Sequence, residues 1–238
     1  MRFALLVPAA GSGIRFAGPV PKAFIELGGE PLFLHAVALG INHAACAEVI
    51  VAAPSDYVKQ TKKLCDDRFG EGRVKIVVGG KVRQESVGLA LAALSADVDW
   101  VLIHDAARPF ADGALLDRVL NACSPDCAAV MPAIPIVDTL KQVGSGPREV
   151  VCTVDRRGLV AVQTPQALRA DVARTAFARA DAEGFVATDD AALVEQFRLG
   201  PVRVVDGDPR NVKITTAADL AMAADLIAAS KTRFGSQR

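Results

Sequence analysis

Aromatic residues are scarce in this chain of 238 residues: they make up 5% of it, with one tryptophan and one tyrosine. A core with so few rings must be built mainly from alanine, valine, leucine and isoleucine. Hydrophobic residues of all kinds reach 51%, which is enough for a sizeable core. This composition is typical of layered α/β proteins.

An excess of charge of either sign is also missing, because lysine plus arginine and aspartate plus glutamate both number 27. Proteins that hold nucleic acid through many phosphates usually carry a basic excess. The sequence contains no basic or acidic tail, internal repeat or low-complexity tract. We therefore expect no nucleic acid partner.

Long hydrophobic runs are absent too. The most apolar window, residues 32–54, is interrupted by His35, Asn42, His43 and Glu48, so it predicts a buried helix followed by a strand rather than a membrane span. The N-terminal segment becomes glycine-rich after a short apolar run and makes a poor signal peptide. We expect a cytoplasmic protein with no membrane partner.

The five cysteines are an odd number and include no CxxC pair. Cys123 and Cys127 have CxxxC spacing, but the sequence offers no companion cluster to complete a zinc site. Reduced thiols in a cytosolic protein are the simplest interpretation.

Short apolar runs alternate with helical patterns along most of the chain. Strands are predicted at residues 3–8, 48–53, 74–78, 100–104, 127–132 and 202–207. Helices are predicted at residues 31–45, 55–68, 83–95, 112–123, 169–183, 189–198 and 216–233. Continuous apolar strands separated by helices indicate a mostly parallel sheet covered on both faces. Ligands of such sheets bind beyond the carboxyl ends of the strands, so the loops that follow the strands are the candidate sites.

Residues 133–160 break this alternation. They contain two strand-like segments around a Gly-Ser-Gly-Pro turn, which predicts a hairpin that projects from the sheet. A two-stranded arm is marginal by itself, so we expect it to pack on a second copy of the chain. No linker is evident, and the chain is interpreted as a single domain, residues 1–238, that carries this arm.

The loop after the first strand resembles a phosphate-binding loop without matching either common kind. A dinucleotide fingerprint requires glycine or alanine three residues after Gly13, where Phe16 stands, and a P-loop lysine is missing as well. Alanine and glycine nevertheless let backbone N–H groups approach a ligand closely. Arg15 and Lys22 follow within a few residues, and two such cations can clamp several phosphates.

Two other loops carry polar groups. Gly80 precedes a predicted helix whose first turn contains Ser86, a side chain that could face a ligand or cap the helix. Asp105 follows the fourth strand and is suited to bind Mg²⁺ or a ribose hydroxyl. Lys81 and Arg83 could contact phosphate, although such side chains more often face solvent.

Three later residues, Thr139, Arg156 and Lys213, are candidates to hold a second anion, and Arg108 could either join them or pair with Asp105. The sequence shows neither a nucleophilic triad nor a His/Cys metal cluster. The chemistry it favours is positioning and charge neutralisation, as in phosphoryl or nucleotidyl transfer.

Several motifs together resemble the 2-C-methyl-D-erythritol 4-phosphate cytidylyltransferase family, and the resemblance spans residues 3 to about 225. They are PAAGSGIRF (8–16), PKAF (21–24), HDAARPF (104–110), DTLK (138–141), TVDRRGL (153–159), TPQ (164–166), TDDAAL (188–193) and NVKITT (211–216). The resemblance implies a three-layer Rossmann-like nucleotidyltransferase fold with a projecting β-arm. It also implies that CTP and a polyol phosphate, in the presence of Mg²⁺ or another divalent cation, give a CDP-alcohol and pyrophosphate.

The resemblance also implies roles for individual residues. Arg15 and Lys22 would stabilise the charge that develops in the transition state. The nucleotide would be bound by Ala9, Ala10, Gly11, Gly13, Gly80, Ser86, Asp105 and Ala106, with Asp105 also binding the metal. The polyol phosphate would be positioned by Arg156, Lys213, Thr139, Arg108 and Thr164. The arm would reach into the other subunit of a homodimer that shares its active sites.

Two positions depart from the family's pattern. Ala23 follows Lys22 where many relatives carry glutamine, and Lys81 follows Gly80 where an acidic residue is common. Two rival functions stay open at this point: a ribitol 5-phosphate cytidylyltransferase, which shares the first loop, and a non-catalytic nucleotide-binding regulator on the same fold.

Overall fold

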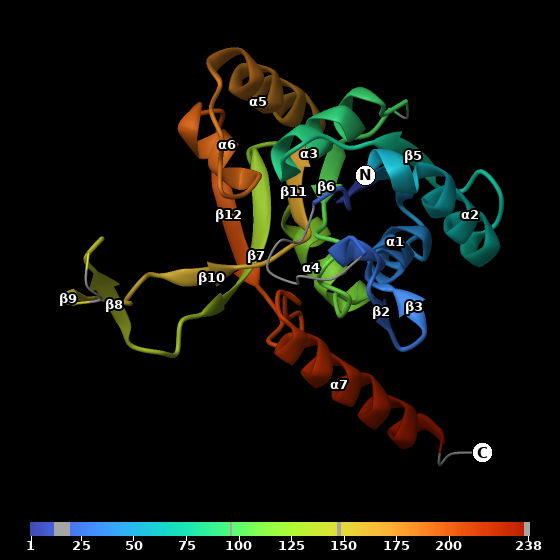
Figure 1. The fold of residues 1–238 in the computed structure, drawn as a ribbon. Coiled ribbons are helices and arrows are strands. Elements are labelled where there is room, and N and C mark those ends of the chain that lie inside the picture. The colour runs from blue at the N-terminus through green and yellow to red at the C-terminus, as the bar shows by residue number, and fades with distance from the viewer. Residues whose placement is uncertain (12–19, 96, 147–148, 236–238) are drawn as a thin grey trace.

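The computed structural model describes residues 1–11, 20–95, 97–146 and 149–235 (Figure 1). Its centre is an eight-stranded sheet with the order β10-β7-β11-β6-β1-β4-β5, in which β12 pairs with β7. The strands are β1 (Phe3–Pro8), β4 (Cys46–Ala53), β5 (Lys75–Val78), β6 (Trp100–Ile103), β7 (Ala129–Pro135), β10 (Val160–Val162), β11 (Gln166–Arg169) and β12 (Val202–Asp206). Neighbouring strands are parallel except where β10 and β11 join. The predicted mostly parallel sheet is confirmed.

Helices cover both faces of the sheet. One face carries α1 (Leu32–Ile41), α2 (Val58–Phe69) and α4 (Gly113–Ala122), and the other carries α3 (Arg83–Ala92), α5 (Ala170–Glu183) and α6 (Ala191–Gln196). Successive side chains of β1 point to opposite faces of the sheet. Phe3, Leu5 and Val7 face the first set of helices, whereas Ala4 and Leu6 face the second. All five side chains are fully buried, as expected for a central strand between two layers.

Smaller elements lie at one end of the sheet. They are the 3-10 helices η2 (Lys22–Phe24) and η3 (Ser55–Tyr57) and the short strands β2 (Glu26–Leu27) and β3 (Glu30–Pro31), which pair with each other. The C-terminal helix α7 (Ala217–Gly235) runs away from the sheet in Figure 1. It is anchored near its start, where Ala223 packs with Leu27, Leu32 and Ile214 in a third apolar cluster.

The arm consists of β8 (Leu140–Val143) and β9 (Val150–Val154), which form an antiparallel sheet of their own. Figure 1 shows it projecting to the left, beyond β7 and β10. Its valines stay on the surface: Val143, Val150 and Val151 are each more than half exposed. An arm with exposed valines and few contacts to its own domain leaves apolar surface for another chain to cover.

No helix among the described residues is both long enough and apolar enough to cross a membrane. The predicted elements are found with boundaries that differ by a few residues. The strand β11 was not predicted. It begins within the TPQ motif, lies between β6 and β7, and runs antiparallel to both.

Candidate active site

A cavity of about 390 Å³ opens beyond the carboxyl ends of β1 and β6. It is lined by Pro8, Ala9, Gly11, Lys22, Ala23, Lys81, Arg83, Ser86, Asp105, Ala106, Ala107, Lys213 and Thr215. Four of these side chains are cationic and one is a carboxylate, so the lining carries an excess of positive charge. Small residues make up much of the remaining wall and leave backbone close to the cavity. Such a site is suited to a polyanion.

The turn after β5 depends on two glycines. A Cβ on Gly79 would lie 2.3 Å from the Cβ of Ala10, and a Cβ on Gly80 would lie 2.3 Å from the Cβ of Glu85. The Gly80 N–H donates to Ser86 Oγ at 3.1 Å, and this hydroxyl also lies 3.1 Å from the Val82 carbonyl oxygen, to which it can donate. Ser86 therefore holds the turn against α3 and lines the cavity. It does not cap α3, whose N-cap residue is Val82 and has no side-chain cap hydrogen bond.

Among the described residues that line the cavity, Asp105 is the only acidic one, and it follows β6 as predicted. Its Oδ1 lies 2.8 Å from Arg83 Nε, and its Oδ2 lies 2.6 Å from Lys213 Nζ. Burial raises the pKa of this carboxyl, but the charges and hydrogen bonds of Arg83 and Lys213 more than offset that effect and hold the pKa well below its ordinary value. Asp105 is therefore ionised at neutral pH.

Arg83 has a second carboxylate partner behind the cavity wall. Its Nη1 and Nη2 donate to the two oxygens of Asp190 at 2.9 and 2.6 Å. Burial alone lowers the pKa of the guanidinium, but the two carboxylates outweigh it and raise the pKa above its ordinary value. The sequence left open whether Arg83 contacts phosphate or faces solvent, and the structure places its side chain in the cavity wall with its charge held between Asp105 and Asp190. The TDDAAL motif was the only signal for Asp190, and the sequence did not indicate which side chain it would meet.

Thr164 and His104 form a chain of hydrogen bonds that begins at the backbone of Asp105. The Asp105 N–H donates to Thr164 Oγ1 at 3.1 Å, and this hydroxyl lies 2.9 Å from His104 Nδ1. The other ring nitrogen lies 3.1 Å from the carbonyl oxygen of Arg108, which assigns the proton to Nε2 and lets Nδ1 accept from Thr164. Burial lowers the pKa of His104 to about 4. His104 is thus a neutral, fully buried histidine of the strand end rather than a base.

Arg108 does not pair with Asp105. Its guanidinium donates instead to the carbonyl oxygens of Asn211 at 2.6 Å and of Val162 at 3.3 Å. These bonds connect the HDAARPF and NVKITT segments, and the buried Asn211 side chain adds a hydrogen bond of 2.8 Å to the carbonyl oxygen of Thr164. Arg108 and Thr164 accordingly lie behind the cavity and are not among its lining residues.

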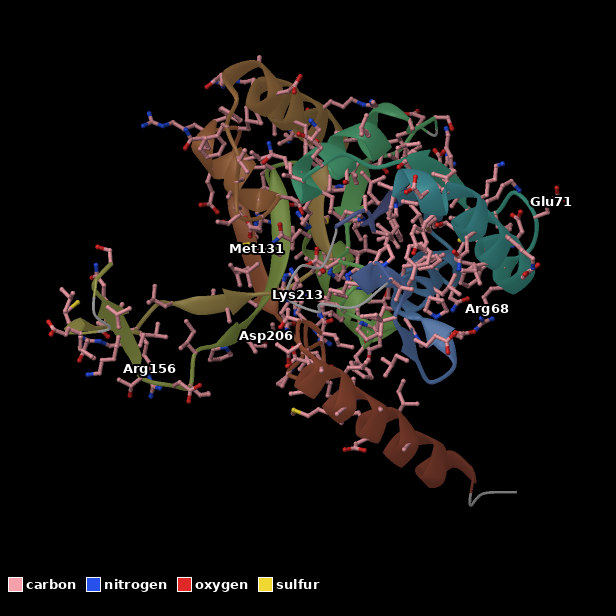
Figure 2. The ribbon with its side chains drawn as sticks, in the orientation of Figure 1. Arg68, Glu71, Met131, Arg156, Asp206 and Lys213 are labelled. Atoms are coloured by element: carbon pink, nitrogen blue, oxygen red, sulfur yellow. The ribbon has the colours of Figure 1, made fainter. Side chains whose placement is uncertain are left out.

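Two of the predicted positioning residues lie on or next to the arm, away from the cavity of the same chain. Thr139 is exposed, and Arg156 is exposed and donates to the Val137 carbonyl oxygen. Figure 2 shows Arg156 on the arm, far from Lys213 at the centre of the molecule. Gly13 and Arg15 lie outside the described residues. The remaining predicted site residues, Ala9, Ala10, Gly11, Lys22, Gly80, Ser86, Asp105, Ala106 and Lys213, line the cavity or its glycine turn.

The chain was compared with known proteins. The family model for 2-C-methyl-D-erythritol 4-phosphate cytidylyltransferase matches residues 3–229. A bifunctional IspD/IspF enzyme of Clavibacter michiganensis is 43% identical over 229 residues, which are 95% of this chain, although the chain spans only 55% of that longer protein. The 2-C-methyl-D-erythritol 4-phosphate cytidylyltransferase of Acidobacterium capsulatum is 39% identical, with 94% of this chain and 96% of the relative covered.

A similar fold is found among solved structures. The 4-diphosphocytidyl-2C-methyl-D-erythritol synthase of Anaerococcus prevotii superposes with a TM-score of 0.81 at 28% identity. The match covers 95% of this chain and 98% of that one, so it extends over the sheet, both helical layers and the arm-bearing half of the chain.

Proposed function

The chain belongs to the 2-C-methyl-D-erythritol 4-phosphate cytidylyltransferase family, and from this membership we infer its reaction. It transfers the cytidylyl group of CTP to 2-C-methyl-D-erythritol 4-phosphate and releases pyrophosphate, a step of isoprenoid biosynthesis. The observation that carries this conclusion is the cavity at the strand ends, which the described residues line with four cationic side chains, one carboxylate and a glycine turn.

The chemistry is an in-line displacement at phosphorus. A phosphate oxygen of the polyol attacks the α-phosphorus of CTP, the bond to the bridging oxygen breaks, and pyrophosphate leaves with that electron pair. Negative charge grows on the phosphoryl oxygens and on the leaving group, so fixed cations lower the barrier. Lys22 and Arg15 are assigned this task, and the backbone around Gly11 and Gly80 is assigned to the nucleotide.

A divalent cation, Mg²⁺ or a similar ion, is assigned to Asp105. Among the described residues no group of three or more His, Cys, Asp or Glu side chains could hold a metal by itself, so most ligands must come from elsewhere. One carboxylate plus substrate phosphates and water is a donor set that suits Mg²⁺. When bound, such an ion would neutralise phosphate charge. Lys213, now paired with Asp105, can then turn to the phosphate of the polyol.

The second substrate site is assigned to two chains. Lys213 lines the cavity, whereas Arg156 lies far from Lys213 (Figure 2) and neither Arg156 nor Thr139 is among the residues that line the cavity. An arm that carries exposed valines and these two polar residues fits a homodimer in which each arm completes the site of its partner. The cytoplasmic location expected from the sequence stays a prediction.

Pyrophosphate release tests the function directly. The protein is incubated with CTP and Mg²⁺, in parallel with 2-C-methyl-D-erythritol 4-phosphate and with D-ribitol 5-phosphate. We expect turnover with the first alone. Turnover with ribitol 5-phosphate alone would keep the transfer chemistry and change the substrate, whereas CTP binding without turnover of either would contradict an enzyme and favour a regulator.

A further inference from the structure

Asp190 lies outside the cavity and yet shares a guanidinium with the carboxylate inside it. The exposed fraction of Asp190 is 2%, and it is absent from the residues that line the cavity. The two oxygens of Asp190 bind Nη1 and Nη2 of Arg83, which leaves Nε to bind Asp105. The planar fork therefore fixes the direction in which Arg83 presents Nε to the cavity.

Asp190 is itself held to the sheet. Gln166, at the start of β11, accepts the backbone N–H groups of Asp190 and Ala191 on its Oε1 at 3.1 and 3.0 Å. Its Nε2 donates to Asp189 Oδ2 at 2.9 Å, and Asp189 Oδ1 accepts the N–H of Ala192 at 2.9 Å. The N-terminus of α6 is thus attached to β11, which pairs with β6, and Asp105 follows β6.

The charges balance across this cluster. Asp105 and Asp190 face two cations, Arg83 and Lys213. A buried ion pair contributes little net stability because desolvation of both partners offsets their attraction. Asp190 instead competes with Asp105 for the guanidinium of Arg83, because the charge and hydrogen bonds of Arg83 are divided between these two carboxylates. Without the Asp190 charge, Arg83 would be drawn entirely to Asp105.

We propose that Asp190 is a positioning residue for the binding of CTP. Asp190 acts through Arg83 to orient Asp105 and to keep this carboxylate available to the complex of CTP with the metal ion. The inference rests on the proposed function, because it takes CTP as the ligand beside Asp105. It assigns no role to Asp190 in binding the polyol phosphate.

The test compares Asp190→Asn with a matched surface variant, Asp126→Asn. Asp126 also pairs with an arginine, Arg203, at 2.6 Å, but it is 72% exposed and lies outside the cavity. Asparagine has nearly the volume of aspartate and can accept only one of the two Arg83 bonds. CTP binding is measured by calorimetry with and without Mg²⁺, KM is measured for both substrates, and thermal unfolding monitors the fold.

For Asp190→Asn we expect the Kd of CTP in the presence of Mg²⁺ to rise about tenfold, the effect of one charged hydrogen bond. The KM of the polyol phosphate should change less than the Kd of CTP, because Asp190 is connected to Lys213 only through Arg83 and Asp105. Asp126→Asn should leave all constants unchanged. A folded Asp190→Asn protein with normal CTP binding, or with equal losses for both substrates, would overturn the proposal.

Arg83→Lys keeps the inference testable if Asp190→Asn does not fold. A lysine keeps the charge but cannot make the three bonds of the fork. Selective loss of CTP binding in folded Arg83→Lys supports the proposal, and normal binding overturns it. If neither variant folds, the ion pair between Arg83 and Asp190 is required for folding, and the proposal fails. Wild-type protein that binds CTP but does not turn over would contradict the proposed function and leave the Asp190 prediction for CTP binding in place.

Discussion

Four cationic side chains line the cavity, and their surroundings give them different tasks. Arg83 and Lys213 are ion-paired with Asp105 in the absence of substrate. Lys22 belongs to η2 and follows the loop after β1, where the residue motifs indicated a triphosphate. Its ammonium lines the cavity, and the proposed function assigns it to the charge that develops on the transferred and departing phosphates.

Lys22→Ala should reduce kcat about a hundredfold or more, since loss of one electrostatic stabiliser of the transition state costs about 3 kcal/mol. CTP binding should weaken only modestly, because the glycine turn and the remaining cations stay in place. Steady-state kinetics with calorimetric CTP titration measures both effects, and Lys63→Ala on exposed α2 serves as the control. Near-normal kcat in Lys22→Ala would remove this residue from the mechanism.

His104 predicts how the stability of the fold depends on pH. Its pKa is lowered to about 4 by burial, whereas a histidine in the unfolded chain titrates near its ordinary pKa of 6.5. The unfolded state therefore binds a proton between these values that the folded state does not, and stability falls as the pH drops from 6.5 to about 4. The full loss is about 3 kcal/mol. Denaturant unfolding of wild type and His104→Gln across this range should show the steeper decline in wild type, and parallel curves would contradict the assignment.

At the scale of elements, the sequence predicted what depends on local pattern and missed what depends on tertiary pairing. The strand β1 was predicted at its observed bounds, because its five apolar residues are buried between two helical layers. The strand β11 has four residues and begins with glutamine, and it becomes a strand only because β6 and β7 lie on either side. For the same reason Gln166, which holds the start of α6, could not be recognised as a structural residue from its motif.

The glycine turn before α3 offers a test at this scale. In Gly80→Ala the new Cβ would meet both the Cβ of Glu85 at 2.3 Å and its Oε2 at 2.6 Å, and that oxygen accepts the N–H of Lys81. The turn must shift, so we expect a destabilisation of ~1–3 kcal/mol and a higher KM for CTP. Gly113→Ala is the control, because no heavy atom lies within 4 Å of its Cβ and alanine favours the helix by up to ~1 kcal/mol. Equal behaviour of the two variants would contradict a tight turn.

At the scale of the whole molecule, the parts of the site divide between the sheet and the arm. The family resemblance named Asp105 and Lys213 as site residues, and the structure places both in one cavity, because both follow strands at the same edge of the sheet. The same resemblance paired Arg156 with Lys213, and the fold of one chain separates them (Figure 2). The resemblance also implied that the arm enters the other subunit, whereas the residue types by themselves gave no indication whether Arg156 and Lys213 meet within a chain or between copies.

Mixing two impaired variants tests whether Arg156 and Lys213 meet within one chain or between two chains. Arg156→Ala should raise the KM of the polyol phosphate far more than that of CTP, and Lys213→Ala should do the same. If each arm completes the partner's site, a heterodimer of the two variants contains one site with both Arg156 and Lys213 and one with neither. Random exchange of subunits at equal concentrations then makes about a quarter of all sites intact. We expect the mixture to recover activity toward that fraction while native mass spectrometry follows the exchange. If exchanged heterodimers have no more activity than the separate variants, a shared site is contradicted, and Arg156 does not act in the site of the partner chain.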